Sequence, residues 1–454
     1  MGVASHLTLQ QIAEQQNQTE QQLKDLAALA LRLAQQKGAE QSEVWCYNTI
    51  GNSLEVRQGE LETLEFNQDS HLGINLYFEQ RKGTVSINDL TEAAIEKGVQ
   101  AAADIARFTE LDPYSGLAEK GLMATQFRDL SLDHPASIDI PQSIELAQSC
   151  EAAALDNPLT KQSEGASFYG HRSVSVYANS HDFVGVNRTT RYSLSNTVIA
   201  QNDKGMIRDG YYSLARNIDD LIPAQLIGQT AAKRVTDKLQ QGKVASGKHP
   251  IIFSPEVART LWGHLFSAIK GGALYQKSSF LLDMKGQQIV PDFINIHEDP
   301  FILKGLGSSN FDSDGVATYK RDIVRDGILK DYFLSSYSAR KLGLSTTANA
   351  GGIHNIIVDS TCGSLEQLMR QIGTGLLVTE VMGQGVNIVT GNYSRGASGF
   401  WFENGQIKHF VQEITIAGNL ADMLNNIVDV ASDVDKRSSI LTGSVAIEGM
   451  IVAS

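Results

Sequence analysis

The sequence has no uninterrupted apolar run of about 18 residues, the length that a membrane-spanning helix needs. Its N-terminus has no lysine or arginine before Lys24 and no apolar core segment, so it does not resemble a secretory signal. Cysteine is scarce too: Cys46, Cys150 and Cys362 are odd in number, far apart, and form no CxxC pair. This usage is typical of a reducing compartment, not of a disulfide framework. We therefore expect a cytoplasmic protein that is not embedded in a membrane.

Positive charge is also in short supply. The chain has 38 lysines and arginines against 51 acidic residues, a net charge of -13. Nucleic-acid binding needs a basic face, so we expect no nucleic-acid partner; an acidic surface also serves solubility. With 454 residues, 42% of them hydrophobic, the chain is long enough for about two domains with substantial cores.

The first half of the chain predicts antiparallel strands flanked by helices. Residues 1–18 are rich in glutamine and are expected to be flexible, with helix beginning near Thr19. From 43 to 87, short β-rich runs separated by glycines predict an antiparallel meander, and alternating segments between 164 and 213 predict further strands. Helical spacing is found in 89–106, 142–155 and 223–239. These elements are assigned to an N-terminal domain of residues 19–240.

A polar stretch that ends in proline, residues 241–250, is expected to be a linker. The second domain, 251–454, contains two strong hairpin signals, Asp326-Gly327 and Asn404-Gly405, each between β-rich runs. Strands and helices alternate without a regular βαβ rhythm, so the predicted fold class is α+β, with a β-dominated C-terminal domain.

Residue pairs that bind zinc are missing as well. A helical zinc site places two histidines one turn apart, but among the ten histidines the closest pair in sequence, His171 and His181, is ten residues apart. His297-Glu298 begins like HExxH, yet Phe301 stands at the second histidine position and Pro300 would interrupt the helix. The spacing therefore predicts no metal site in this chain.

Three other motifs are incomplete. The segment from Gly242 to Lys248 matches GxxxxGK, but His249 follows instead of Ser or Thr, and a strand rather than a helix is expected next. Residues 310–314 begin like a calcium loop, but Arg321 replaces its last ligand, so we expect a solvent-facing acidic turn in which only weak cation binding is open. The pairs Ser267-x-x-Lys270 and Ser338-x-x-Lys341 have no accompanying motif of a serine hydrolase, and GxSxG is absent.

Several long blocks nevertheless resemble the PmbA/TldD family. They include GNSLEVRQGELETLEFNQDSHLGINLYFEQRKGTVSINDL (51–90), FSPEVARTLWGHLFSAIKGGALYQKSSFLL (253–282), GVATYKRDIVRDGILKDYFLSSYSARKLG (315–343), TTANAGGIHN (346–355) and GASGFWFENGQIKHFVQEITIAGNL (396–420). The blocks keep one order from about residue 50 to the C-terminus. Such coverage implies the family's two-domain fold, with a C-terminal domain of its metallopeptidase type.

The resemblance is to the branch without metal. In the TldD branch, the helix of the 253–282 block carries HExxxH, whereas this chain keeps His264 but has Leu265 at the glutamate position and Ile269 at the second histidine position. The branch also uses a late cysteine as a ligand, and no cysteine follows Cys362. A catalytic zinc needs three protein ligands and a base. The chain therefore looks like a PmbA (TldE) subunit with no catalytic or metal residues of its own, in which His264 is a lone remnant.

The family resemblance implies a role beside a zinc-binding, TldD-like partner that cleaves unfolded peptides, including maturation of a peptide antibiotic or degradation of an antitoxin. In this hypothesis the present chain closes the chamber and offers strand edges to an extended peptide. The alternative is a non-catalytic homodimer that binds peptides or a protein, in line with the family's older label of gyrase modulator. Candidates for lining the peptide surface are His264, Tyr275, Ser278, Tyr337, Arg340, His354 and Asn355.

Overall fold

The computed structural model describes residues 9–136, 138–203 and 205–454, with side chains from Thr19 onward. The chain divides into two compact units. Unit 1 comprises Met1–Thr236, Leu303–Gly305 and Ser309–Thr318, and unit 2 comprises Asp237–Ile302, Leu306–Ser308 and Tyr319–Ser454. Two short segments of the second half of the sequence, Leu303–Gly305 and Ser309–Thr318, thus complete the first unit.

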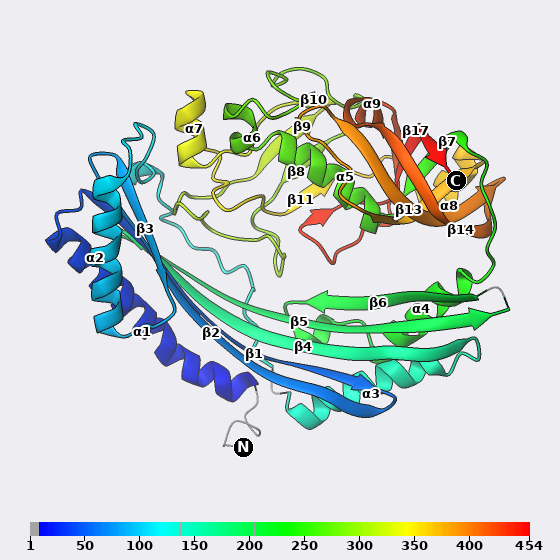
Figure 1. Ribbon diagram of the computed structural model, residues 1–454, viewed down its shortest axis with the longest axis horizontal. Coiled ribbons are helices and arrows are strands. Elements are labelled where there is room, and N and C mark those ends of the chain that lie inside the picture. Colours follow the sequence, from blue (N-terminus) through cyan, green and yellow to red (C-terminus); the bar gives the residue numbers. More distant parts are fainter. Residues whose placement is uncertain (1–8, 137, 204) are drawn as a thin grey trace. The chain divides into compact units, whose positions relative to one another are not determined.

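Unit 1 is built on one antiparallel sheet of six strands. Its order is β3-β2-β1-β4-β5-β6, and Figure 1 shows the long, curved ribbons of β1, β2, β4 and β5. The β1–β2 turn has Gln58 and Gly59 at positive φ, the geometry of a tight hairpin. The strands are β1 (Gln41–Arg57), β2 (Glu60–Phe78), β3 (Arg81–Ile87), β4 (Thr160–Asn179), β5 (Phe183–Asn202) and β6 (Gly205–Ala215).

Four helices cover this sheet with two separate cores. Leu23 of α1 (Leu9–Gln36) and Ile95 of α2 (Glu92–Phe108) pack with Leu72 of β2 in one core. In the other, Cys150 of α3 (Ile140–Leu155) and Ile227 of α4 (Ala224–Asp237) pack with strand residues such as Leu54. Short 3-10 turns lie at Lys120–Leu122 and Ile218–Asp220.

One predicted helix boundary was wrong. Helix α1 begins at Leu9, not near Thr19, so much of the glutamine-rich segment expected to be flexible is helical, while residues 1–8 lie outside the described part. Glutamine, glutamate and alanine favour helix, and no glycine or proline interrupts the stretch from Leu9 to Thr19. The helices predicted at 89–106, 142–155 and 223–239 are confirmed as α2, α3 and α4.

The segment Ser309–Thr318 packs against the beginning of strand β5 in unit 1. The Phe311 ring meets the rings of Phe127 and Phe183 edge-on, with centroids 6.1 and 5.5 Å away. A β-carbon on Gly185 would lie 2.5 Å from the Phe311 ring, so this strand position needs glycine. The Ala124 amide donates to the Gly315 carbonyl at 3.0 Å. The segment is therefore an integral part of the first unit's core.

Unit 2 contains two sheets. The larger has the order β14-β13-β12-β7-β17-β15, and β14 also pairs with β17, so five of its strands close on themselves. Its strands are β7 (Gly247–Phe253), β12 (Gly375–Met382), β13 (Asn392–Glu403), β14 (Gln406–Asn419), β15 (Ile427–Val430) and β17 (Val445–Ala453). The smaller has the order β10-β9-β8-β11-β16. It consists of β8 (Ile296–Glu298), β9 (Arg321–Arg325), β10 (Ile328–Leu329), β11 (Ile356–Val358) and β16 (Ile440–Leu441).

Five helices belong to unit 2, namely α5 (Pro255–Ala268), α6 (Gly271–Tyr275), α7 (Ser336–Leu342), α8 (Leu365–Ile372) and α9 (Leu420–Asn425). Both predicted hairpins are confirmed: Asp326-Gly327 joins β9 to β10 and Asn404-Gly405 joins β13 to β14, all four residues with positive φ. The predicted 241–250 linker was wrong in its last four residues. Strand β7 begins at Gly247, because its main chain pairs with β17 despite the polar local sequence.

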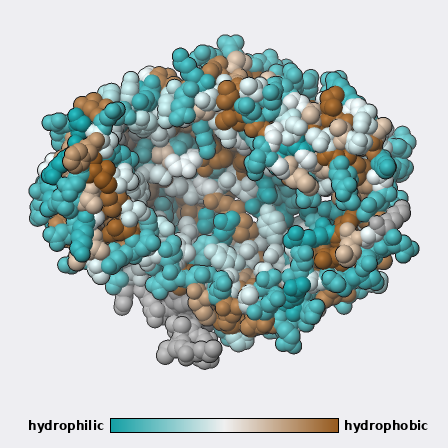
Figure 2. Space-filling view, in the orientation of Figure 1, coloured by the Kyte–Doolittle hydropathy of each residue, from teal (hydrophilic) through white to brown (hydrophobic). Residues whose placement is uncertain are grey.

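The predicted α+β class is confirmed, with a β-dominated second half. On the face seen in Figure 2, apolar side chains occur in small groups separated by hydrophilic ones. No helix in the described part of the chain is long and apolar enough to cross a lipid bilayer.

Candidate functional site

Helix α5 carries the lone histidine of the incomplete zinc motif. Pro255 occupies its first turn, and Val257, Leu261 and Leu265 recur at helical spacing on its buried side. The indole Nε1 of the buried Trp262 donates to Thr442 Oγ1 at 3.0 Å, which ties the helix to the segment before β17. The helix is therefore held rigidly by its apolar side.

The two positions that would hold a glutamate and a second histidine lie in the hydrophobic core. Leu265 and Ile269 are both 0% exposed and belong to the main apolar cluster of unit 2. A charged or metal-ligating side chain there would lose its hydration without gaining a polar partner. This side of α5 is built for packing.

His264 itself is half-buried beside one aromatic ring and one cation. Its imidazole meets the Tyr393 ring edge-on, with centroids 6.1 Å apart, and its Nε2 has no hydrogen-bond partner among the described residues. Burial lowers the pKa of His264, and the nearby Arg395 lowers it further. Burial also raises the pKa of Tyr393 to about 12. The imidazole is thus neutral at pH 7, and the Arg395 charge makes the site unfavourable for a metal cation.

The cysteines offer no ligand set either. Cys46 and Cys150 are buried in the two cores of unit 1, where burial raises each thiol pKa to about 12. The pKa of Cys362 in unit 2 is also raised, by burial and then by Asp429 and Asp433. Within the described residues, no three His, Cys, Asp or Glu side chains gather as a metal-binding group. The described residues do not fit a catalytic zinc.

Two of the predicted peptide-lining residues lie together. Tyr275 of α6 and Tyr337 of α7 meet edge-on with ring centroids 6.0 Å apart, and Lys341 Nζ lies 5.4 Å from the Tyr337 ring centroid. Figure 1 shows these two short helices near each other, and Arg340 follows on α7. Ser278 comes just after α6, and its hydroxyl donates to the Gln276 carbonyl at 3.3 Å. These partly exposed aromatic and basic side chains could contact a peptide, but they include no pair of catalytic groups.

Asn355 and His354 do not belong to an accessible lining, which corrects that part of the prediction. Asn355 is 1% exposed, and its amide nitrogen donates to the Asp299 carbonyl and to Ser308 Oγ. Its Oδ1 accepts the Gly307 amide at 2.8 Å. His354 is 8% exposed, and its Nε2 lies 2.9 Å from the Ala348 carbonyl oxygen. Both residues hold neighbouring loops in place.

A buried ionic network beside these loops has no counterpart in any local sequence pattern. Arg321 donates to Glu298 Oε2 and to Asp331 Oδ2, each at 2.9 Å, and its third arm donates to Asn349 Oδ1 at 2.6 Å. Glu298 is 1% exposed and also accepts from the His354 backbone amide at 2.8 Å. Every oxygen of Glu298 is thus engaged, which indicates a structural rather than a catalytic carboxylate.

The incomplete motifs have structural roles. Gly247 and Lys248 pair with β17, so the GxxxxGK segment runs into a strand. Ser338 Oγ belongs to the capping box of α7, accepting from the Ser335 amide at 3.0 Å. The hydroxyl of Ser267 donates to the Gly263 carbonyl at 2.8 Å. Each of these groups is used in local structure.

The acidic turn at 310–314 differs from the prediction in one respect. Asp312 is only 4% exposed, and its Oδ1 accepts the backbone amides of Asp314 and Val316 at 2.9 and 3.0 Å. The turn is therefore held by its own carboxylate and is not wholly solvent-facing.

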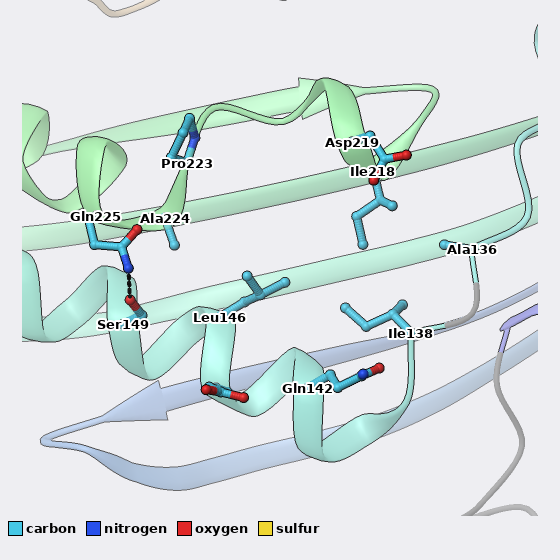
Figure 3. A pocket seen from close by; sticks show the side chains of 11 residues that line it. Ala136, Ile138, Gln142, Leu146, Ser149, Ile218, Asp219, Pro223, Ala224 and Gln225 are labelled. Carbon is cyan, nitrogen blue, oxygen red and sulfur yellow. Dashed lines mark hydrogen bonds between the residues drawn. The ribbon is translucent and has the colours of Figure 1, made fainter.

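Unit 1 contains an open groove of ≈ 620 Å³ between α3 and the segment that leads into α4. Figure 3 shows Ile138, Leu146 and Ile218 around its apolar part, while Gln225 Nε2 donates to Ser149 Oγ at 2.8 Å on one side. Its lining has neither histidine nor cysteine. Its titratable side chains are the carboxylates of Glu145 and Asp219, and the lining supplies no basic partner for them.

Comparison with protein families gives three consecutive matches. They are the PmbA/TldA metallopeptidase domain 1 at residues 43–106, the central domain at 133–239, and the C-terminal domain at 246–454. Among relatives, the chain is 48% identical over 433 residues to "Metalloprotease PmbA" of Escherichia coli O157:H7, covering 95% of this chain and 96% of that protein. It is 47% identical to "Metalloprotease PmbA homolog" of Haemophilus influenzae, covering 96% of each.

Solved structures with the same fold are found as well. A putative modulator of DNA gyrase from Bacteroides thetaiotaomicron matches with a TM-score of 0.90 and 30% identity, covering 95% of this chain and 98% of that one. TldE from Thermococcus kodakarensis matches with a TM-score of 0.81 over 93% and 99% of the two chains; at 19% identity, this likeness shows a shared fold. The chain belongs to the PmbA/TldD family, as its sequence blocks indicated.

Proposed function

We propose that this chain is the subunit without metal of a two-part zinc peptidase, and that a TldD-like partner binds the zinc and supplies the base. The zinc would activate water for attack on a peptide bond. The partner would carry the HExxxH motif that this chain lacks. The chain alone is then inactive as a peptidase, although it belongs to a peptidase family.

The observation that carries this proposal is the orientation of α5. A motif that had merely lost one ligand would leave its remaining positions facing an open site. Here Leu265 and Ile269 are fully buried, and His264 lies near the Arg395 cation. In this chain, the positions that would bind metal in the TldD branch instead pack in the hydrophobic core of unit 2.

Extended, unfolded peptides are the proposed substrates of the assembly. The partly exposed rings of Tyr275 and Tyr337 supply aromatic contacts for such a chain. Arg340 and Lys341, which lie on α7 with Tyr337, supply basic contacts. Contacts of this kind do not depend on one substrate sequence, which suits peptide-antibiotic precursors and unfolded antitoxins. The three free cysteines suit the cytoplasm as its place of action.

The experiment measures bound zinc and peptide cleavage for this chain, for the family member with HExxxH from the same genome, and for their mixture. An unstructured fluorogenic peptide is the substrate. The controls are this chain after heat denaturation and a partner whose motif glutamate is replaced by glutamine.

We expect zinc to stay with the partner, and cleavage to appear or rise at least tenfold only with the native mixture. Stoichiometric zinc and chelator-sensitive cleavage by this chain alone would overturn the proposal. A mixture that neither associates nor gains activity would instead favour the alternative, a homodimeric binding module.

A further inference from the structure

We propose that the outer half of strand β2, from Glu60 to Asp69, is a docking edge for an extended peptide that alternates apolar and basic residues. The site lies wholly within unit 1, whereas α5 and the tyrosine pair belong to unit 2. It rests on the geometry of β2 and not on the proposed role beside a zinc subunit.

The edge is free because β3 is short. Strand β3 pairs with β2 only from Leu72 to Phe78, whereas β1 pairs with β2 along the other side from Glu60 to Tyr77. Figure 1 shows β2 extending well beyond β3. Over Glu60–Asp69, the main-chain groups that point away from β1 have no strand partner in the described part of the chain. Such a row of unpaired amides and carbonyls is a template for an added strand.

One face of this edge is apolar. Leu61 pairs across the ladder with Val56, and Leu64 pairs with Leu54, so both lie on the face on which β1 packs into a core of unit 1. Phe66 is two residues further along the same face. Unlike their neighbours on β1, these three side chains remain 41, 37 and 44% exposed. An added strand would cover them with apolar residues at every second position.

The other face is acidic. Glu65 and Asp69 project there, and Glu60 and Glu62 lie beside the turn. No lysine or arginine occurs between Glu60 and Asp69. Opposite charges on neighbouring strands stabilise a sheet, and like charges oppose pairing. The strand that suits this edge therefore has lysine or arginine on the positions that alternate with its apolar residues.

The same charges argue against a second copy of this chain. Two β2 edges in contact would bring eight carboxylates together, and of the four on each edge Glu62 is paired with Arg57 of β1 at 3.7 Å. Acidic residues on an edge are a known protection against self-pairing. They do not protect against a basic strand, and the exposed Leu61, Leu64 and Phe66 would then be covered as well. Charge complementarity thus selects the occupant.

The test uses the full chain and a labelled ten-residue peptide that alternates valine and lysine, with capped ends. Comparison peptides alternate valine and glutamate, or hold the valines and lysines in two separate blocks. Binding is followed by fluorescence anisotropy at low and at physiological salt. Amide hydrogen exchange then locates the bound peptide on the chain.

Two double variants address the two faces. E60K/E65K reverses two charges on the edge, and L64S/F66S removes apolar surface. E96K/E110K is the matched control, since Glu96 on α2 and Glu110 just after that helix are exposed acids of unit 1 that do not belong to β2.

We expect the alternating lysine peptide to bind at least tenfold more tightly than either comparison peptide and to protect amides within 60–69. E60K/E65K should weaken binding at least tenfold, L64S/F66S at least fivefold, and E96K/E110K less than twofold. Equal binding of the glutamate peptide, equal weakening by E96K/E110K, protection outside β2, or no binding at 1 mM peptide would each overturn the proposal. Self-association that only L64S/F66S abolishes would also overturn it, because the occupant would then be a second copy.

Discussion

Replacing Leu265 by glutamate, which restores one residue of the missing motif, should destabilise the chain severely. Leu265 is 0% exposed in the core of unit 2. Losing a buried leucine costs about 2–5 kcal/mol, and burying a carboxyl group without a partner adds about 1–3 kcal/mol. The expected loss is therefore about 3–8 kcal/mol, comparable with the roughly 5–15 kcal/mol that keeps a typical domain folded.

The loss should also depend on pH in a defined direction. Burial raises the pKa of the new carboxyl group above its unfolded value of about 4.3, so the folded state holds the proton more tightly. The stability of the variant then falls as pH rises from the unfolded towards the folded pKa. Urea unfolding at pH 5 and pH 8 measures this, and L265E should lose more stability at pH 8.

The matched control is L344E, because Leu344 is a leucine of unit 2 with 43% exposure, and a surface change of this kind should stay within about 0.5 kcal/mol. The double variant L265E/I269H tests the motif itself. It rebuilds HExxxH in sequence, yet it should neither recover stability with zinc nor bind the metal stoichiometrically. The reasoning is refuted if L265E lies within 1 kcal/mol of the wild type, or if zinc raises the unfolding midpoint of the double variant.

Three further predictions concern buried polar groups. R321M leaves the Glu298 carboxylate buried without its cation, so urea unfolding should show a loss of about 3–5 kcal/mol, partly recovered in R321M/E298Q. N355A breaks three buried hydrogen bonds and should cost about 2–4 kcal/mol in the same assay, whereas N392A, at an exposed site, should cost almost nothing. Burial, together with Arg191 and Arg216, lowers the pKa of His171 to about 4. Because the unfolded state takes up the proton at a higher pH than the folded state, the free energy of unfolding should fall as pH drops from about 6.5 to about 4. The expected fall is about 1–3 kcal/mol, and H171F should remove it.

Each of these has a clear contradicting result. An R321M chain as stable as the wild type would mean that the Glu298 charge is compensated by other groups. Equal losses in N355A and N392A would assign the effect to composition and not to the buried amide. An NMR titration of His171 with a midpoint near 6.5 would remove the cause of the predicted acid sensitivity.

Local patterns were enough to predict the elements whose partners are close in sequence. The β1–β2–β3 meander and α2 follow from alternation, glycine punctuation and the helical spacing of Ile95 and Val99. The two hairpin turns follow from the positive φ that Asp-Gly and Asn-Gly accept. Ligand spacing on a helix is also local, so the absence of a zinc pair on α5 is a prediction that Leu265 and Ile269 support from sequence alone.

Features that depend on distant residues were not predictable. Glu298 is bonded to Arg321 and Asn349, which lie 23 and 51 residues further along the chain. Asn355 looked like an accessible polar residue in a glycine-rich block, but the loop at 299–308 buries it. The start of β7 likewise depends on β17, near the C-terminus. The free edge of β2 is visible only once the short reach of β3 is known.

The return of Ser309–Thr318 to unit 1 has a consequence for the order in which the protein is made. Domains generally fold as units while the ribosome is still synthesising the chain, N-terminal part first. Here the first unit lacks Phe311 and its contacts with Phe127 and Phe183 until Thr318 has left the exit tunnel. By then strand β7 and helix α5 of the second unit have already emerged. The N-terminal half is thus completed late, and the two halves of the nascent chain must mature together.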